Sequence, residues 1–232
     1  AFALVRPPGH HALAHRAMGF CLFNNIAVAA AWALAEGGVS RLAIVDFDVH
    51  HGNGTQAAFD GDPRVLFAST HQYPYFPGTG DWRDDAPLDR GGHCLNIPLP
   101  ARTGDAGYRQ AFEQLIVPAV RRHRPELILV SAGYDAHWAD PISWMRASLA
   151  GYRLMADALA ALSGELCQSR LVMALEGGYH LQVLAHGVAT TCCAMLSLPS
   201  DDPFGPDPNP RGEVDVTELL NRIAEYHGLK GR

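Results

Sequence analysis

Four ionisable side chains crowd the end of one apolar segment of the sequence. In "RLAIVDFDVHHGNGT" (residues 41–55), an apolar run is followed by two carboxylates and two imidazoles: Asp46, Asp48, His50 and His51. Such groups are costly to bury unless a partner compensates them. Residues two apart in an extended segment point to the same side, so Asp48 and His50 can reach one ion together.

Asp135, which follows another apolar segment, can supply a third ligand to the same ion. Two carboxylates and one imidazole leave an open coordination position, as a catalytic zinc requires. The same set also suits Fe(II) or another divalent ion, because affinity order alone does not select the metal. The sequence therefore predicts a catalytic metal site without deciding the metal.

The pair His10-His11 in "RPPGHHA" provides candidates for a general base near that metal. Histidine is the usual base for a metal-activated water, and it needs a partner that orients its ring. Asp46 and Asn53 are the candidate partners. An aspartate would make its histidine more basic, whereas an asparagine would orient the ring without adding charge.

Three aromatic residues near glycines are further candidates. Tyr179 follows a Gly-Gly pair, whose tight turn can bring the phenol toward the metal as an oxyanion donor. Phe20 follows Gly19, and Phe76 precedes Pro77. Two aromatic residues on loops of the same edge predict a narrow apolar slot for a substrate.

The elements that must position these residues alternate between strand and helix patterns. The expected strands are short and continuously apolar: Phe2–Val5, Leu42–Phe47, Val65–Ser69, Leu127–Ser131 and Leu171–Leu175. The expected helices are Asn24–Glu36, Ala106–His123, Ala147–Glu165, Leu181–Leu196 and Val216–Tyr226. This alternation predicts one α/β domain over residues 1–232, with a mainly parallel sheet between helices. The polar clusters follow strands, so they should meet at the carboxyl edge of the sheet.

Composition excludes several classes of protein. The 232 residues are 48% hydrophobic and carry a net charge of -6, which argues against nucleic acid or an anionic membrane as the main partner. The 5 cysteines have no zinc-ribbon spacing, and no signal peptide opens the chain, so we expect reduced thiols in the cytoplasm. Lys230 is the only lysine among 18 basic residues, which, with heavy alanine usage, suggests a bacterial source.

Six segments together resemble the zinc-dependent histone deacetylases and their bacterial relatives, the deacetylase-like and acetylpolyamine amidohydrolases. In chain order they are "RPPGHHA", "GFCLFNN", "VDFDVHHGNGTQ", "FPGTGD", "SAGYDAHWADP" and "EGGY". "HHGNG" and "DAHWADP" look more like class II than class I members. The resemblance implies a three-layer α/β/α fold of the arginase/deacetylase type. It also implies that the family's N-terminal segment is missing from this chain.

The resemblance also implies roles for individual residues. The zinc ligands would be Asp48, His50 and Asp135. His10 would pair with Asp46 and His11 with Asn53, with His11 favoured as the proton shuttle and Tyr179 stabilising the transition state. A structural potassium ion would use Asp46, Ser69 and the backbone of Thr70, with the carbonyls of Asp48 and His50. The acyl-lysine channel would be lined by Gly19, Phe20, Phe76, Gly178 and Ile142.

The implied reaction is zinc-dependent hydrolysis of an N-acetyl amide, above all acetyl-lysine in a protein or a small molecule. One alternative is an acetylpolyamine amidohydrolase, which Ile142 weakens because polyamine-selective eukaryotic members have a glutamate there. A second alternative is a non-catalytic acyl-lysine binding module, against which Tyr179, His10 and His11 argue. The expected partner is an acetylated lysine-like amine, with no direct nucleic acid and no membrane, and a homo-oligomer is compatible with the sequence.

Overall fold

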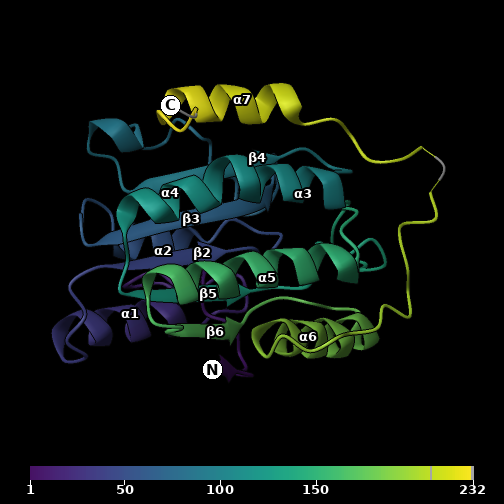
Figure 1. The fold of residues 1–232 in the computed structure, drawn as a ribbon, viewed down its shortest axis with the longest axis horizontal. Coiled ribbons are helices and arrows are strands. Elements are labelled where there is room, and N and C mark those ends of the chain that lie inside the picture. Colours follow the sequence, from purple (N-terminus) through teal and green to yellow (C-terminus); the bar gives the residue numbers. More distant parts are fainter. Residues whose placement is uncertain (210, 231–232) are drawn as a thin grey trace.

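A six-stranded parallel sheet forms the centre of the computed structural model, which describes residues 1–209 and 211–230 (Figure 1). Its strands are β1 (Phe2–Ala3), β2 (Leu42–Asp46), β3 (Val65–Gln72), β4 (Cys94–Leu99), β5 (Leu127–Ala132) and β6 (Leu171–Leu175). Their spatial order is β1-β6-β5-β2-β3-β4, and every neighbouring pair is parallel. The predicted parallel sheet is therefore confirmed.

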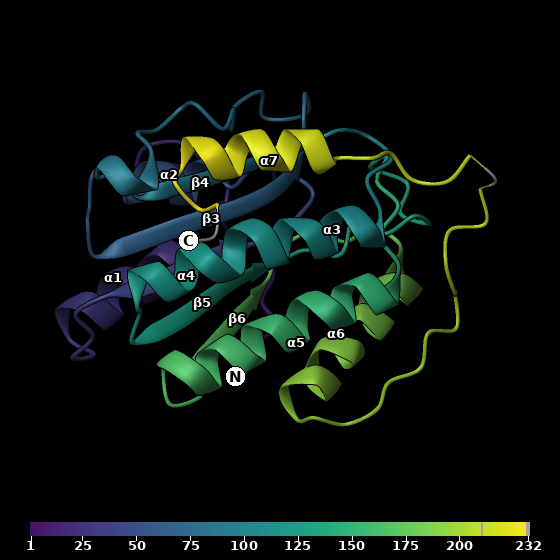
Figure 2. The same ribbon diagram turned by 45° about the horizontal axis from the view of Figure 1, so that its top comes forward.

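Helices cover both faces of this sheet. They are α1 (Asn25–Ala35), α2 (Asn53–Ala58), α3 (Asp105–Ala111), α4 (Val117–His123), α5 (Leu149–Leu166), α6 (Leu181–Met195) and α7 (Thr217–Tyr226). Alternate residues of β2 point to opposite faces: Ala43 and Val45 join a core with α3, α5 and α7, whereas Leu42 and Ile44 pack with α1. Figures 1 and 2 show α3, α4 and α5 side by side over one face of the sheet. This is the expected three-layer α/β/α arrangement.

One strand was not expected from the sequence. Among the described strands, β4 pairs only with β3 and forms one edge of the sheet. It contains Pro98, which cannot donate a ladder hydrogen bond and is tolerated in sheets mainly at edges. The proline and the neighbouring polar Asn96 hid this strand in the sequence. At the opposite edge, β1 covers only the first half of the expected segment Phe2–Val5.

The helix expected over residues 106–123 is interrupted. A π-helical turn, η2 (Phe112–Ile116), separates α3 from α4, and Pro118 lies in the first turn of α4. Proline lacks the N–H that would continue the α-helical ladder, so a wider turn precedes it. The remaining short element is a 3₁₀ turn, η1 (Leu88–Arg90).

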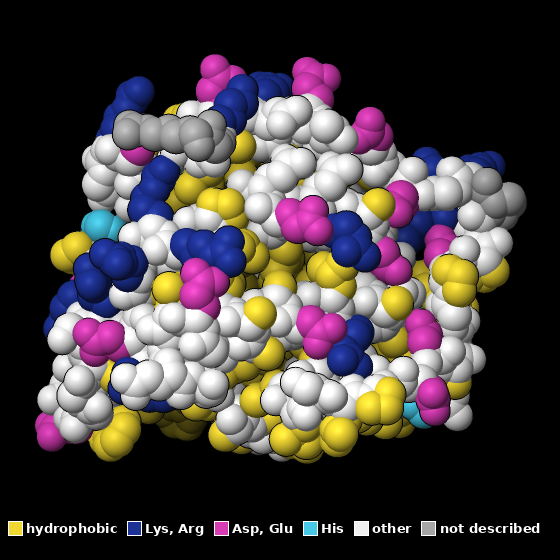
Figure 3. All heavy atoms as spheres, in the orientation of Figure 1, with side chains coloured by type: hydrophobic (Ala, Val, Ile, Leu, Met, Phe, Trp, Pro, Cys, Tyr) yellow, Lys and Arg dark blue, Asp and Glu magenta, His cyan; other side chains and the backbone are white. Residues whose placement is uncertain are grey.

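The surface over α3, α5 and α7 carries acidic and basic side chains interspersed, with hydrophobic side chains exposed between the helices (Figure 3). No helix in the described part of the chain combines the length and the apolarity that a membrane span requires.

Candidate active site

A cavity of about 350 Å³ opens where the loops after β1, β2, β3, β5 and β6 meet. Because the strands are parallel, their carboxyl ends share this edge. The lining residues are Pro8, His10, His11, Gly19, Phe20, Asp48, His50, Tyr75, Phe76, Ile142, Gly177 and Tyr179. Gly178 does not line the cavity as expected. A side chain at Gly178 would meet Leu184 of α6, and the glycines that line the cavity are Gly19 and Gly177.

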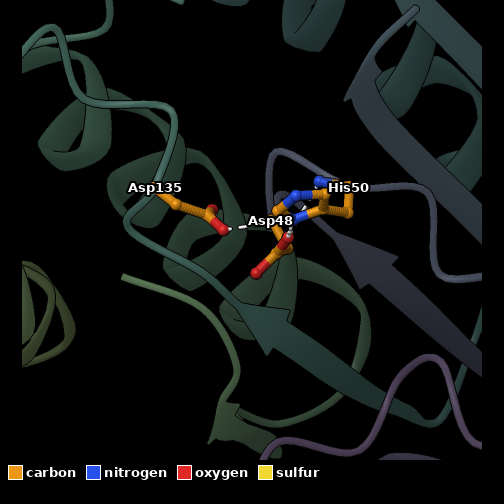
Figure 4. Close-up of side chains that lie close together, drawn as sticks. All are labelled: Asp48, His50 and Asp135. Carbon is orange, nitrogen blue, oxygen red and sulfur yellow. Dashed lines mark hydrogen bonds and ion pairs between the residues drawn. The ribbon is translucent and has the colours of Figure 1, made fainter. Parts of the chain in front are cut away.

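Asp48, His50 and Asp135 point toward one another (Figure 4), and one ligand atom of each lies within 4.8 Å of the others. Nδ1 of His50 lies 3.0 Å from Oδ1 of Asp48 and 3.2 Å from Oδ2 of Asp135. All three residues are buried, and Oδ2 of Asp135 accepts no hydrogen bond from the described residues. A buried carboxylate oxygen without a hydrogen bond is costly, and a divalent cation held between Asp135 and His50 would compensate it. This donor set fits zinc and leaves a coordination position open.

The charges around this trio favour a cation. Burial by itself would lower the pKa of His50, but its contacts with Asp135 and Asp48 raise that pKa to about 10. Asp48 is held in place by two backbone donors: Oδ1 accepts from the N–H of His50 at 2.8 Å, and Oδ2 from the N–H of Gly177 at 2.8 Å. The Asp48 carboxylate is therefore oriented in advance toward a point of positive charge.

Two glycines let the backbone pass close to these carboxylates. A Cβ atom at Gly177 would lie 2.2 Å from Oδ2 of Asp135 and 2.5 Å from Oδ2 of Asp48. At Gly133 it would lie 2.0 Å from Oδ2 of Asp48. No other residue type fits at such distances, so the glycines of "SAGYD" and "EGGY" are required by the carboxylate cluster itself.

His10 and His11 have neighbouring rings, with centroids 4.0 Å apart, but unlike partners. Nδ1 of His10 lies 2.9 Å from Oδ2 of Asp46, and Nδ1 of His11 lies 2.8 Å from Oδ1 of Asn53. Burial alone would lower the pKa of His10, but nearby carboxylates, Asp46 first, raise it well above the ordinary value. Burial and the charge of His10 lower the pKa of His11 to about 3. His11 is therefore neutral, and with Nδ1–H donating to Asn53 its Nε2 is free to accept a proton.

Tyr179, Phe20 and Phe76 form part of the cavity walls. Burial and the charges of Asp135 and Asp48 raise the pKa of Tyr179 above its ordinary value, so the phenol stays a donor. Phe20 and Phe76 are 70% and 45% exposed and form the outer walls, and the ring of Phe76 meets that of His11 edge-on at 5.0 Å.

The residues of the expected potassium site also lie together. Asp46 and Ser69 are paired across β2 and β3, and both are fully buried. Oδ1 of Asp46 accepts from the N–H of Asp48 at 3.1 Å, and Ser69 Oγ lies 3.0 Å from Nδ1 of His71. The Thr70 hydroxyl is buried without a hydrogen bond to the described residues.

Two residues of the site were not identified from the sequence. The ring of Tyr75 stacks on His50 with centroids 5.4 Å apart. Glu176 is fully buried. Its Oε2 accepts from the N–H groups of Gly9 at 2.7 Å and His10 at 3.1 Å. Its Oε1 accepts from the Ser131 hydroxyl at 3.0 Å. A charged residue directly after the apolar run of β6 was the available signal for Glu176.

Comparisons with known proteins identify relatives of the chain. The family model of the histone deacetylase domain matches residues 1–195. The chain is 48% identical over 233 residues to "Histone deacetylase 10, chloroplastic" of Oryza sativa, covering 98% of this chain and 52% of the rice protein. It is 44% identical over 180 residues to the "Histone deacetylase-like amidohydrolase" of Pseudomonas aeruginosa, covering 77% of this chain and 47% of that protein.

A solved structure has the same fold. The crystal structure of the HDA15 HD domain matches with a TM-score of 0.83 and 35% sequence identity, covering 97% of this chain and 60% of that chain. The chain spans about half the length of the curated relatives it matches. Because these relatives include plant and bacterial proteins, the bacterial source of this chain stays a prediction.

Proposed function

The chain belongs to the histone deacetylase family, and we propose that it hydrolyses the N-acetyl amide of a lysine-like amine. The observation that carries this proposal is one cavity whose lining brings Asp48 and His50, the partners of Asp135 in the trio, together with two unlike histidines and a tyrosine. Amide hydrolysis needs an activated water, a base that accepts its proton and a donor for the developing oxyanion. The cavity offers a candidate for each of these roles.

We assign zinc to the trio Asp48, His50 and Asp135. When bound, zinc would polarise the acyl carbonyl and lower the pKa of a water molecule toward ~7. The buried Oδ2 of Asp135 supports this assignment, because its close polar neighbour is the ring nitrogen of His50, another candidate ligand. We also assign a potassium ion to Asp46, with Ser69 and the backbone of Thr70, because the fully buried Asp46 carboxylate gains from a second cation.

The protein's own groups divide the proton transfers between them. Neutral His11 accepts the proton of the attacking water at Nε2, while Asn53 fixes the ring through Nδ1. His10 keeps its proton because Asp46 stabilises the charge, and it acts as an electrostatic element. The Tyr179 hydroxyl donates to the oxyanion, and the protonated His11 then donates to the leaving amine.

The cavity walls favour acetyl-lysine as the substrate. Phe20 and Phe76 offer aromatic surface to an aliphatic linker, and Ile142 adds an apolar side chain to the lining. An acetylpolyamine carries a further ammonium group, and Ile142 provides no charge to pair with it. A cytoplasmic location and a homo-oligomeric state stay predictions for this chain.

A turnover assay tests the proposal. The zinc-loaded protein is offered an acetyl-lysine peptide and N-acetylputrescine, and acetate release is measured. We expect release from the peptide, loss of activity after chelation and its return with zinc. His50→Ala should abolish turnover, whereas His15→Ala, at an exposed position outside the cavity, should not. Faster turnover of acetylputrescine would identify a polyamine amidohydrolase, and zinc binding without turnover of either substrate would indicate a binding module.

A further inference from the structure

Asp140 joins the two loops that carry the metal ligand Asp135 and the oxyanion donor Tyr179. Its Oδ2 accepts from the N–H groups of Tyr179 at 2.7 Å and His180 at 2.9 Å. Its Oδ1 accepts from the N–H of Ile142 at 3.0 Å. One carboxylate therefore holds three backbone donors, two from the loop after β6 and one from the loop after β5.

These hydrogen bonds are protected from water and favoured by charge. Asp140 is only 5% exposed. Hydrogen bonds to an ionised acceptor are about twice as strong as neutral ones. His180 is the N-cap residue of α6, so the carboxylate also lies at a helix N-terminus, where negative charge is stabilised.

Tyr179 needs such an external anchor because the backbone before it is permissive. Gly177 and Gly178 precede it, and Gly178 has a φ of +133°. The ring of Tyr179 lies against Phe20 with centroids 6.3 Å apart, but Phe20 is itself 70% exposed. The position of the hydroxyl therefore depends on how firmly the backbone N–H of Tyr179 is held.

We propose that Asp140 is a positioning residue that fixes Tyr179 for oxyanion stabilisation by binding its backbone and that of His180. The inference rests on the proposed function, because it assigns a partner to the role of Tyr179 in that reaction. Asp140 touches neither the acyl group nor the metal in this scheme and acts only through Tyr179. Misplacement of a catalytic group by about 1 Å can cost about 100-fold in rate.

The side-chain chemistry provides a selective perturbation. Asp140→Asn keeps the size but replaces one acceptor oxygen by an N–H₂ group, which must face either Ile142 or the pair Tyr179 and His180. A donor then opposes a donor, and one side of the clamp is lost. We expect kcat to fall by about 10- to 100-fold with little change in KM or zinc content. Asp140→Glu, which keeps the charge but displaces it, should act in the same way if Asp140→Asn folds poorly.

A double-mutant cycle with Tyr179→Phe is the decisive measurement, with kcat measured on the acetyl-lysine peptide. If Asp140 acts through Tyr179, Asp140→Asn lowers kcat in the wild-type background and has less than about a twofold effect in Tyr179→Phe. Additive losses, or a normal kcat for Asp140→Asn, would overturn the positioning role. A normal kcat for Tyr179→Phe would instead refute the proposed role of the tyrosine.

Asp105→Asn is the matched control. Asp105 also binds backbone near a helix N-terminus, since its Oδ1 accepts from the N–H of Ser148, the N-cap residue of α5, at 2.8 Å. It does not line the cavity. Asp105→Asn should lower the free energy of unfolding while kcat stays within about twofold of wild type. The effect of Asp105→Asn on kcat should be the same in the wild-type and Tyr179→Phe backgrounds. An equal loss of kcat in this control would attribute the Asp140 effect to general destabilisation and overturn the inference.

Discussion

Glu176 should be one of the most costly side chains to remove from this fold. Replacing it by alanine leaves the N–H groups of Gly9 and His10 and the Ser131 hydroxyl without their acceptor in a fully buried place. Each unsatisfied buried polar group costs about 1–3 kcal/mol, so the two N–H groups and the hydroxyl together predict a loss of about 3–9 kcal/mol. That is a large part of the 5–15 kcal/mol by which domains are typically stable.

Glu176→Gln separates the hydrogen bonds from the charge. The amide oxygen can accept from both N–H groups, and the amide N–H₂ can donate to the Ser131 oxygen, so each partner stays satisfied. What is lost is the charge assistance, partly offset by weaker repulsion of the nearby Asp46 carboxylate. We therefore expect a loss of about 1–2 kcal/mol, well below that of the alanine variant.

Glu213 provides a control that differs in exposure. Its carboxylate accepts from the N–H groups of Gly104, Ala106 and Gly107, but the residue is exposed. Water can replace the carboxylate there, so Glu213→Ala should cost less than about 1 kcal/mol. The comparison with Glu176 isolates burial, because both side chains bind backbone donors.

Urea denaturation followed by circular dichroism measures the free energy of unfolding of each variant. The expected order of destabilisation is Glu176→Ala, then Glu176→Gln, then Glu213→Ala. Equal losses for Glu176→Ala and Glu176→Gln would show that charge, rather than hydrogen bonding, sets the cost. A loss below 1 kcal/mol for Glu176→Ala would refute the argument from buried donors.

Three further outcomes are expected. Asp135→Ala should bind much less zinc by metal analysis while its circular dichroism spectrum stays native, and full zinc occupancy would contradict the ligand assignment. His11→Ala should lower kcat far more than His10→Ala, because His11 is the neutral base, and the reverse order with zinc bound in both would exchange the two roles. Burial lowers the pKa of His227 to about 4 from an ordinary value of 6.5. Between these pH values the unfolded state therefore binds more protons than the folded state. The free energy of unfolding should fall as the pH drops from about 6.5 to 4. In urea titrations across this range, His227→Gln should flatten that slope by up to about 1.4 kcal/mol per pH unit, and an unchanged slope would exclude His227 as its source.

Much of the architecture was predictable because its signals are local. Continuous apolar runs mark β2, β5 and β6 as strands covered on both faces, and the alternation with helices predicts a parallel sheet. Parallel strands share one carboxyl edge, so the meeting of Asp48, His50 and Asp135 followed from the position of each after its strand. The edge strand β4 was missed because Pro98 is compatible only with a place at the edge, and no local pattern shows which strand occupies an edge.

The sequence by itself determined which residue types reach the site and the chemistry open to them. Only the tertiary structure decided how each is held and charged. The hydrogen bond between Gly9 and Glu176 joins residues 167 positions apart. The one between Tyr179 and Asp140 joins residues 39 positions apart. Hydrogen bonds that a distant backbone N–H donates to a side chain leave no periodicity in the sequence. In the same way, adjacent His10 and His11 differ in protonation because folding buries one beside Asp46 and the other beside Asn53.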